Sequence, residues 1–303
     1  MTSRIIGKVL MDYQIRATAA NDSIRAFAIY AKDTVEEARK RHGLSPVVCA
    51  AVGRVLMGAA MMSRMEKDDR NLLTIQVIGD GPIGGITVTA SPSGLLKGFA
   101  NHPHAEVPPK YSGKLDVGAA VGSGFLRVMR DSGGSQPYIG TVDLVSGEIA
   151  EDLTYYFAQS EQTPSTVGLG VLVDIDCTVS TAGGFIIQLM PDTPDEYISI
   201  LEKNLSQLSP VTELLSEGQS PEDILNAVLD GMDINIVEKR KISFNCDCSR
   251  DRVIKSLLSL NPAELQEMID DDKPTEVYCD FCGERYTFEK TDLHRLIIPS
   301  PEA

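Results

Sequence analysis

The sequence lacks an uninterrupted apolar run of the kind that crosses a membrane, which needs about 18 to 20 predominantly apolar residues. Its most apolar stretch, Cys49 to Met62, is interrupted by Arg54. The first ten residues, MTSRIIGKVL, also lack the apolar segment and small-residue cleavage site of a secretory signal. These absences predict a cytoplasmic protein that does not associate with membranes.

Basic residues are scarce. The chain has 28 lysines and arginines against 43 aspartates and glutamates, and its formal net charge is −15. Unspecific binding to nucleic acid or to anionic lipid needs a positive field, so the balance argues against both. Six cysteines in a reducing compartment are not expected to form a standing disulfide framework, and clustered ones indicate metal or redox chemistry.

A chain of 303 residues has room for two or three units, because single cores stop growing at about 250 to 300 residues. Residues 1–190 predict a mixed α/β core domain of the α+β class, since strands and helices do not alternate regularly. The expected helices are residues 34–41 with Asp33 as N-cap, 46–65 and 148–160. Short β-rich runs bounded by turn residues predict strands at 72–78, 86–89, 125–129, 138–145, 171–175 and 185–189.

Residues 191–235 form a distinct acidic segment, called the connector below. It contains ten acidic residues and one basic residue, and therefore carries −9 of the net charge. Prolines 194, 210 and 221 divide its helical apolar pattern into three short helices. Helices of this length are marginal alone and need docking to persist. The connector is expected to fold conditionally, although an acidic helical linker that never moves fits the same pattern.

Four cysteines lie in the last segment, residues 236–303. Cys246 and Cys248 form one close pair, and Cys279 and Cys282 form a second pair after thirty intervening residues. Two chelating pairs of thiolates are the ligand set of a tetrahedral Zn²⁺ ion, so the segment predicts a small C-terminal zinc-binding domain with one zinc. His294 is an alternative ligand, but a lone histidine on an amphipathic helix is more typical of a surface position.

A zinc site of this kind can act as a switch. Structural zinc contributes on the order of 10 to 16 kcal/mol to a small fold, whereas whole domains are stable by only about 5 to 15 kcal/mol. A thiolate that enters a disulfide no longer binds the metal, and exposed thiolates react with oxidants. The oxidised segment is therefore expected to be less folded than the reduced one.

The remaining candidates have structural interpretations. The glycine groups near residues 79–85, 118–124 and 133–134 match no phosphate-binding fingerprint and predict turns. His102 and His104 predict a surface turn, and Cys49 and Cys177 predict inert apolar positions. The methionines of the second helix and the aromatic residues of the third fit either a core or a client surface, so client-binding residues stay open. No catalytic set is recognisable in residues 1–190, and the protein is not expected to be an enzyme.

Four segments together resemble the redox-regulated heat-shock holdases of about 33 kDa, also called 33 kDa chaperonins. They are PYIGTVDLVSGEIAEDLTYYFAQSEQTPS (137–165), GGFIIQLMP (183–191), FNCDCSRDR (244–252) and VYCDFCGERYTF (277–288). The resemblance covers nearly the whole chain. One departure is Met190, where the family commonly has leucine, and this change conserves volume.

The resemblance implies a reduced, zinc-bound, inactive monomer in which Cys246, Cys248, Cys279 and Cys282 are both metal ligands and redox-active thiols. Under oxidative stress the family forms disulfides Cys246–Cys248 and Cys279–Cys282, releases zinc, unfolds its zinc module and linker, and dimerises. The active form holds unfolding client proteins without ATP until foldase chaperones take them. The alternative is a zinc-stapled binding module that regulates nucleic acid or a protein partner.

Overall fold

The computed structural model describes residues 11–65, 71–111, 113–133, 136–271 and 273–297. The chain divides into two compact units, Met1–Asn245 and Cys246–Ala303. MTSRIIGKVL and Gly134, on which some of the expectations above rest, lie outside the described residues.

Two sheets form the first unit. One has the order β10-β1-β2-β9-β8 and is antiparallel throughout, with β1 (Tyr13–Ala19), β2 (Ile24–Tyr30), β8 (Ser165–Val173), β9 (Val179–Leu189) and β10 (Ile234–Lys241). The other has the order β11-β5-β4-β3-β6-β7, with β3 (Leu72–Gly79), β4 (Ile86–Ala90), β5 (Leu95–Ala100), β6 (Gly124–Asp131), β7 (Tyr138–Asp143) and β11 (Ser243–Phe244). Only β11 runs parallel to its neighbour. The antiparallel sheets confirm the α+β class.

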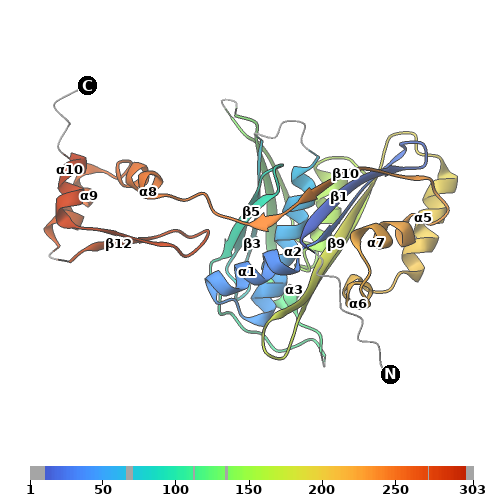
Figure 1. Cartoon of the computed structure of the whole chain (residues 1–303), viewed down its shortest axis with the longest axis horizontal. Coiled ribbons are helices and arrows are strands. Elements are labelled where there is room, and N and C mark those ends of the chain that lie inside the picture. Colours follow the sequence, from blue (N-terminus) through green and yellow to red (C-terminus); the bar gives the residue numbers. More distant parts are fainter. Residues whose placement is uncertain (1–10, 66–70, 112, 134–135, 272, 298–303) are drawn as a thin grey trace. The chain divides into compact units, whose positions relative to one another are not determined.

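Helix α2 (Pro46–Ser63) lies between the two sheets and contacts strands of both (Figure 1). It is longer than the apolar run recognised in the sequence, and among the described helices it alone has the length and composition to cross a membrane. However, 89% of it is buried inside the protein, as in the core helix of a soluble domain. Met57, Met61 and Met62 are fully buried, so these methionines are core residues in this structure. Arg54 is neutralised by Glu148, with 2.7 Å between Nη1 and Oε2.

The first helix, α1 (Lys32–His42), begins two residues earlier than predicted, so Asp33 lies in the first turn and is not the N-cap. The cap comes instead from outside the helix. The Asp12 carboxylate accepts hydrogen bonds from the backbone N–H groups of Asp33 and Thr34. A carboxylate at this position also interacts favourably with the helix dipole.

A buried carboxylate organises the turn before α4 (Ala150–Gln159). Asp152 is fully buried, and its two oxygens accept hydrogen bonds from the backbone N–H groups of residues 145, 146, 147 and 149. Ile149 has a φ of 69°, which is strained for a β-branched residue. The Asp152 hydrogen bonds offset this strain and hold the segment between β7 and α4.

Replacing Asp152 with asparagine should destabilise the first unit by about 3 kcal/mol, because hydrogen bonds to a charged acceptor contribute about 1.5 to 3 kcal/mol each and buried donors would lose their partner. The expected fall in Tm is roughly 6 to 12 °C. Differential scanning calorimetry of D152N measures it. Glu151→Gln, which removes the same charge from the exposed neighbour, is the matched control, and an equal Tm for both variants would contradict this role.

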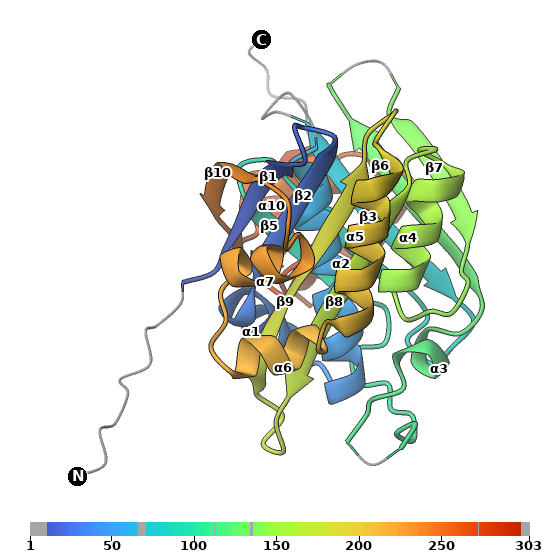
Figure 2. The same ribbon diagram turned by 90° about the vertical axis from the view of Figure 1, so that its right-hand side faces the viewer.

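The connector covers the outer face of the five-stranded sheet (Figure 2). As predicted, it forms three short helices that follow the prolines: α5 (Asp195–Gln207), α6 (Val211–Ser216) and α7 (Pro221–Val228). On the sheet side the contact is made largely by alanines of β1 and β2 and by longer side chains, namely Ala17, Ala19, Ala26, Ala28, Ile15, Ile24, Phe185 and Ile187. On the connector side it is made by Leu201, Val211, Leu214, Leu215, Ile224, Leu225, Val228, Leu229 and Met232.

The chain after the connector returns to both sheets. β10 pairs with β1, and β11 pairs with β5, so residues 236–245, assigned by sequence to the C-terminal domain, here lie in the first unit. Gly94 has a φ of 92°, and a Cβ there would lie 2.2 Å from the carbonyl oxygen of Lys241. Phe244 is buried and packs edge-on against His42, with 6.2 Å between ring centroids. β11, the last strand before the cysteines, is thus held in place by close packing against Gly94 and by the buried Phe244 side chain.

The second unit is small. It contains α8 (Arg250–Leu257), α9 (Pro262–Asp270), a hairpin of β12 (Thr275–Tyr278) and β13 (Arg285–Phe288), and α10 (Lys290–Ile297). Its buried apolar cluster, among the described residues, consists of Val253, Leu257, Leu265, Ile269, Phe288 and Leu293. A core of six side chains is small for a fold of this length, which suggests an additional source of stability.

Candidate metal centre

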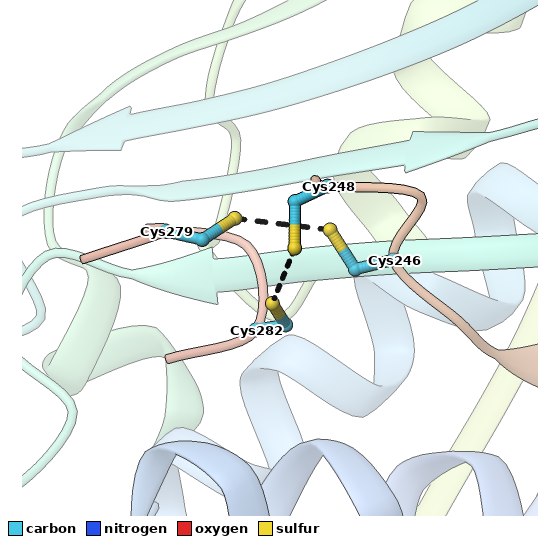
Figure 3. A group of neighbouring side chains, drawn as sticks. All are labelled: Cys246, Cys248, Cys279 and Cys282. Carbon is cyan, nitrogen blue, oxygen red and sulfur yellow. Dashed lines mark hydrogen bonds between the residues drawn. The ribbon is translucent and has the colours of Figure 1, made fainter. Parts of the chain in front are cut away.

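The four predicted cysteines lie together in the second unit (Figure 3). Their sulfur atoms all lie within 4.8 Å of one another. Sγ of Cys246 is 3.8 Å from Sγ of Cys279, and Sγ of Cys248 is 3.3 Å from Sγ of Cys282. Each close contact joins sulfurs of different motifs, and all four thiols are free.

The second motif is placed by the turn of the β12–β13 hairpin. The backbone N–H of Cys279 donates to the carbonyl of Glu284, and those of Cys282 and Gly283 donate to the carbonyl of Cys279. Gly283 has a φ of 71°, a conformation that glycine adopts without strain. The tight turn points both sulfurs to the same side.

The first motif precedes α8 in an extended segment. Ser249 caps this helix, since its hydroxyl accepts from the backbone N–H of Arg252. Arg250 then joins α8 to the hairpin and to α10. Its guanidinium lies 4.1 Å from the centre of the Phe288 ring and donates hydrogen bonds to the Thr287 carbonyl and the Asp292 carboxylate. These contacts fix the position of the first motif relative to the hairpin that carries the second motif.

The arrangement fits a tetrahedral metal ion. Zinc–sulfur bonds of about 2.3 Å at tetrahedral angles place sulfurs about 3.8 Å apart, close to the two distances observed. Four thiolates are the donor set of zinc and iron–sulfur sites, and among the described residues no histidine, aspartate or glutamate joins the group. The four cysteines could therefore hold one metal ion. Cys282 is buried and the other three are half-buried, so small oxidants have access to the site.

The thiols of Cys246, Cys248 and Cys282 differ in acidity. Burial raises the pKa of the Cys246 thiol to about 11, and burial also raises the pKa of Cys282. Burial opposes ionisation of Cys248 too, but hydrogen bonds from the Tyr286 hydroxyl at 3.1 Å and from the neighbouring thiols lower its pKa below the usual value. Of these three thiols, Cys248 best stabilises negative charge.

Tyr286 belongs to the site but was not predicted from the sequence. The residue lies in the motif VYCDFCGERYTF, but its role depends on the pairing of β12 with β13, which sets Tyr286 opposite Val277. The hydrogen bond to Cys248 in turn raises the pKa of the Tyr286 hydroxyl, which therefore stays protonated and can donate.

The other sulfur and imidazole candidates lie elsewhere. Cys49 is fully buried on α2, and burial raises its pKa to about 12, in agreement with an inert thiol. The expectation for Cys177 was wrong, because this residue is exposed in the turn between β8 and β9 with a φ of 65°. His102 and His104 bond the backbone carbonyls of Pro82 and Gly43 and join no metal-binding group among the described residues.

His294 lies on α10 and does not belong to the group of clustered sulfurs. The glycine groups that could have suggested a phosphate cradle form turns and close backbone contacts. Gly79, for example, leaves no room for a Cβ beside the carbonyl of Val121. In the helix α4, Tyr156 and Phe157 are fully buried core residues, whereas Tyr155 is exposed.

Known proteins of one family resemble this chain over nearly its whole length. A family model described as Hsp33 protein matches residues 12–289. A 33 kDa chaperonin of Lachnoclostridium phytofermentans is 50% identical over 95% of this chain and 99% of its own, and one of Clostridioides difficile is 46% identical over 95% and 99%. The crystal structure of the 33 kDa chaperonin (HSP33) from Thermotoga maritima superimposes with a TM-score of 0.88 at 35% identity, covering 95% of this chain and 98% of that one.

Proposed function

The chain belongs to the Hsp33 family of chaperones, and we propose that it is a redox-regulated, ATP-independent holdase. In the resting form, one Zn²⁺ ion would be held by Cys246, Cys248, Cys279 and Cys282. Under oxidative stress the protein loses the metal, unfolds its C-terminal region, dimerises and binds unfolding client proteins in the cytoplasm. Foldase chaperones then receive the clients.

Bound zinc would neutralise the thiolates and join the two cysteine motifs, and so stabilise a fold whose own core is small. The oxidative step acts on the chain's own sulfurs. Two thiols lose two electrons and two protons to a peroxide, which is reduced to water, and one disulfide forms. Family membership implies the pairs Cys246–Cys248 and Cys279–Cys282. These close very small loops, which give little of the loop-closure stabilisation needed to replace the metal.

The observation that carries the proposal is the connector on the five-stranded sheet. Nine buried apolar residues of the connector region cover a sheet face that is itself apolar. If the connector leaves, both surfaces become exposed, and large contiguous apolar patches are typical of protein-binding surfaces. The connector carries −9 of the net charge of −15 and consists of helices too short to persist alone, so its folded state depends on docking.

Coupling between the metal centre and the connector is inferred to pass along the chain through β11 and β10. β11 contains only two residues, and it ends two positions before Cys246. Unfolding of the cysteine module would leave this short strand as the end of the ordered chain, where fraying is easiest. Loss of β11 and then of β10 would remove the anchor that follows α7.

The test is a combined titration with peroxide at mildly elevated temperature. Zinc released per chain is measured with a chromogenic chelator, and light scattering follows the aggregation of a denatured test protein. We expect one zinc per chain, and suppression of aggregation that rises with zinc release. Cys177→Ser should behave as the wild type, because this exposed cysteine lies outside the site.

Retained zinc, or release without holding activity, would contradict the proposal. Salt-dependent binding of nucleic acid by the reduced protein would favour a zinc-stapled regulatory module instead.

A further inference from the structure

A cavity of about 590 Å³ lies in the first unit where three segments meet. Arg25 of β2 contributes to its wall, the turn between α4 and β8 contributes Gln162 to Pro164, and the turn from β9 into α5 contributes Leu189 to Thr193. Ile198 of α5 completes the wall. Figure 2 shows β9 ending beside the start of α5. The cavity is of the size that holds small organic ligands.

Arg25 has no acidic partner within the described part of the chain. Its guanidinium donates through Nε and Nη2 to Oε1 of Gln188, at 3.1 and 2.6 Å. Gln188 is fully buried and donates in turn to the Ser165 hydroxyl, so the arginine is fixed in position by neutral groups. A half-buried guanidinium that is held firmly and left unpaired remains available to an anion.

A second arginine increases the positive potential. Arg16 pairs with Phe27 and Arg25 pairs with Thr18 in the β1–β2 ladder, so the two arginines are diagonal neighbours on one face, about 7 to 8 Å apart at Cα. The buried Nε of Arg16 has no hydrogen-bond acceptor within the described residues. The nearby Glu161 is already bonded to Arg130. Burial and the charge of Arg16 lower the pKa of Arg25, which reflects the cost of this arrangement.

The mouth of the cavity is built from strained backbone. Gln162 and Asp192, neither of them glycine, have φ values of 51° and 64°. Such conformations cost of the order of 1 to 3 kcal/mol each and tend to occur where ligands are clamped. Both turns lie outside the metal centre, at residues 162–164 and 189–193.

We propose that this cavity binds a small amphipathic oxyanion. Its carboxylate or phosphate group would accept hydrogen bonds from Arg25, since guanidinium groups recognise both anions. Its short apolar part would lie against Leu189, Met190 and Ile198. Asp192 is exposed, so it disfavours a second anionic group near the entrance.

A ligand in this cavity would also regulate activation. This consequence rests on the proposed function, whereas the binding site itself does not. A ligand there contacts the core through Arg25 and the connector through Ile198. Because it binds the docked connector only, it stabilises that state by mass action. The ligand would therefore raise the amount of oxidant and heat needed for activation.

The experiment uses reduced, metal-loaded protein without oxidant or client, so its result is independent of the redox proposal. Inorganic phosphate, phenyl phosphate and octanoate are titrated at constant ionic strength and followed by ¹H–¹⁵N NMR. We expect saturable shifts at residues 162–165 and 189–193. The apolar probes should bind at least about tenfold more tightly than phosphate, which corresponds to about 1.4 kcal/mol. Phenyl phosphate and octanoate distinguish a phosphate ligand from a carboxylate ligand.

Two variants test the role of Arg25. Arg25→Gln removes the charge but keeps an amide N–H that can donate to Oε1 of Gln188, so it should weaken anion binding at least tenfold in a protein that still folds. Arg25→Lys keeps the charge but loses the paired N–H donors of the guanidinium, so it should bind with intermediate affinity. Arg127→Gln, on the other sheet, is the matched control and should bind as the wild type. Absence of saturable binding by every probe, shifts confined to other residues, or equal affinity of R25Q and wild type would each overturn the proposal.

Discussion

Removing the metal from the four-cysteine site is expected to unfold the second unit while the two sheets of the first unit stay folded. A structural zinc contributes on the order of 10 to 16 kcal/mol to a small fold, whereas a single core below about 70 to 80 residues rarely contributes more than 3 to 5 kcal/mol. The six buried side chains of this unit cannot make up the difference. The same outcome is expected for Cys248→Ser, because serine is a poor replacement for a thiolate ligand.

Amide hydrogen exchange measures this prediction region by region. Residues 250–297 should lose protection in the chelated protein and in C248S, and β2, β3 and β9 should keep theirs. Cys49→Ala is the control for loss of a cysteine elsewhere, since that thiol is buried in the first unit. A metal-free second unit whose amides stay protected would exclude the metal as the source of its stability.

The second large effect is expected from α7, where an acidic substitution should release the connector without touching the metal. Ile224 is fully buried against the sheet. Ile224→Asp loses about 1.5 to 3 kcal/mol of apolar burial and adds the penalty of an unpaired carboxylate. We expect the reduced, metal-loaded variant to suppress aggregation of a test protein and to be cut within residues 191–235 at least about tenfold faster by protease.

Asn226→Asp provides a closely matched control, because it adds the same charge to the exposed side of the same helix. It should behave as the wild type in both assays. Zinc content should be one per chain in both variants. If I224D became protease-sensitive without gaining holding activity, exposure of the sheet face would not be sufficient to bind clients.

The sequence predicted the strands and helices that are bounded by turn-forming residues. Glycine and β-branched residues predicted β3, β4 and β6 within about two residues, and the prolines predicted the three connector helices. β1 and β2 were not predicted, because their alanines carry no strand signature and a sheet covered on both faces loses the alternation of apolar and polar residues. β10, with the sequence INIVEKRK, is a strand only through its pairing with β1.

The residues of the candidate sites likewise fall into those that local sequence predicts and those that depend on strand pairing. The spacing of the four cysteines predicted a common site because each pair is local in the chain, and their sulfur atoms do lie within 4.8 Å of one another. Tyr286 and Arg25 could not be identified in this way, since one depends on the register of a hairpin and the other on a neighbour in an adjacent strand. Cys177 was misplaced because an exposed hairpin turn and the end of a buried strand read alike in a single sequence.

The alanines of β1 and β2 have a consequence for recognition. The outer face of the sheet is nearly flat where it is formed by the small side chains of Ala17, Ala19, Ala26 and Ala28. The larger side chains that cover it are isoleucines and leucines of the connector. Once uncovered, such a face offers no deep pockets that would require a particular partner side chain. It would select for apolar area and not for amino-acid order, which suits the holdase role proposed above.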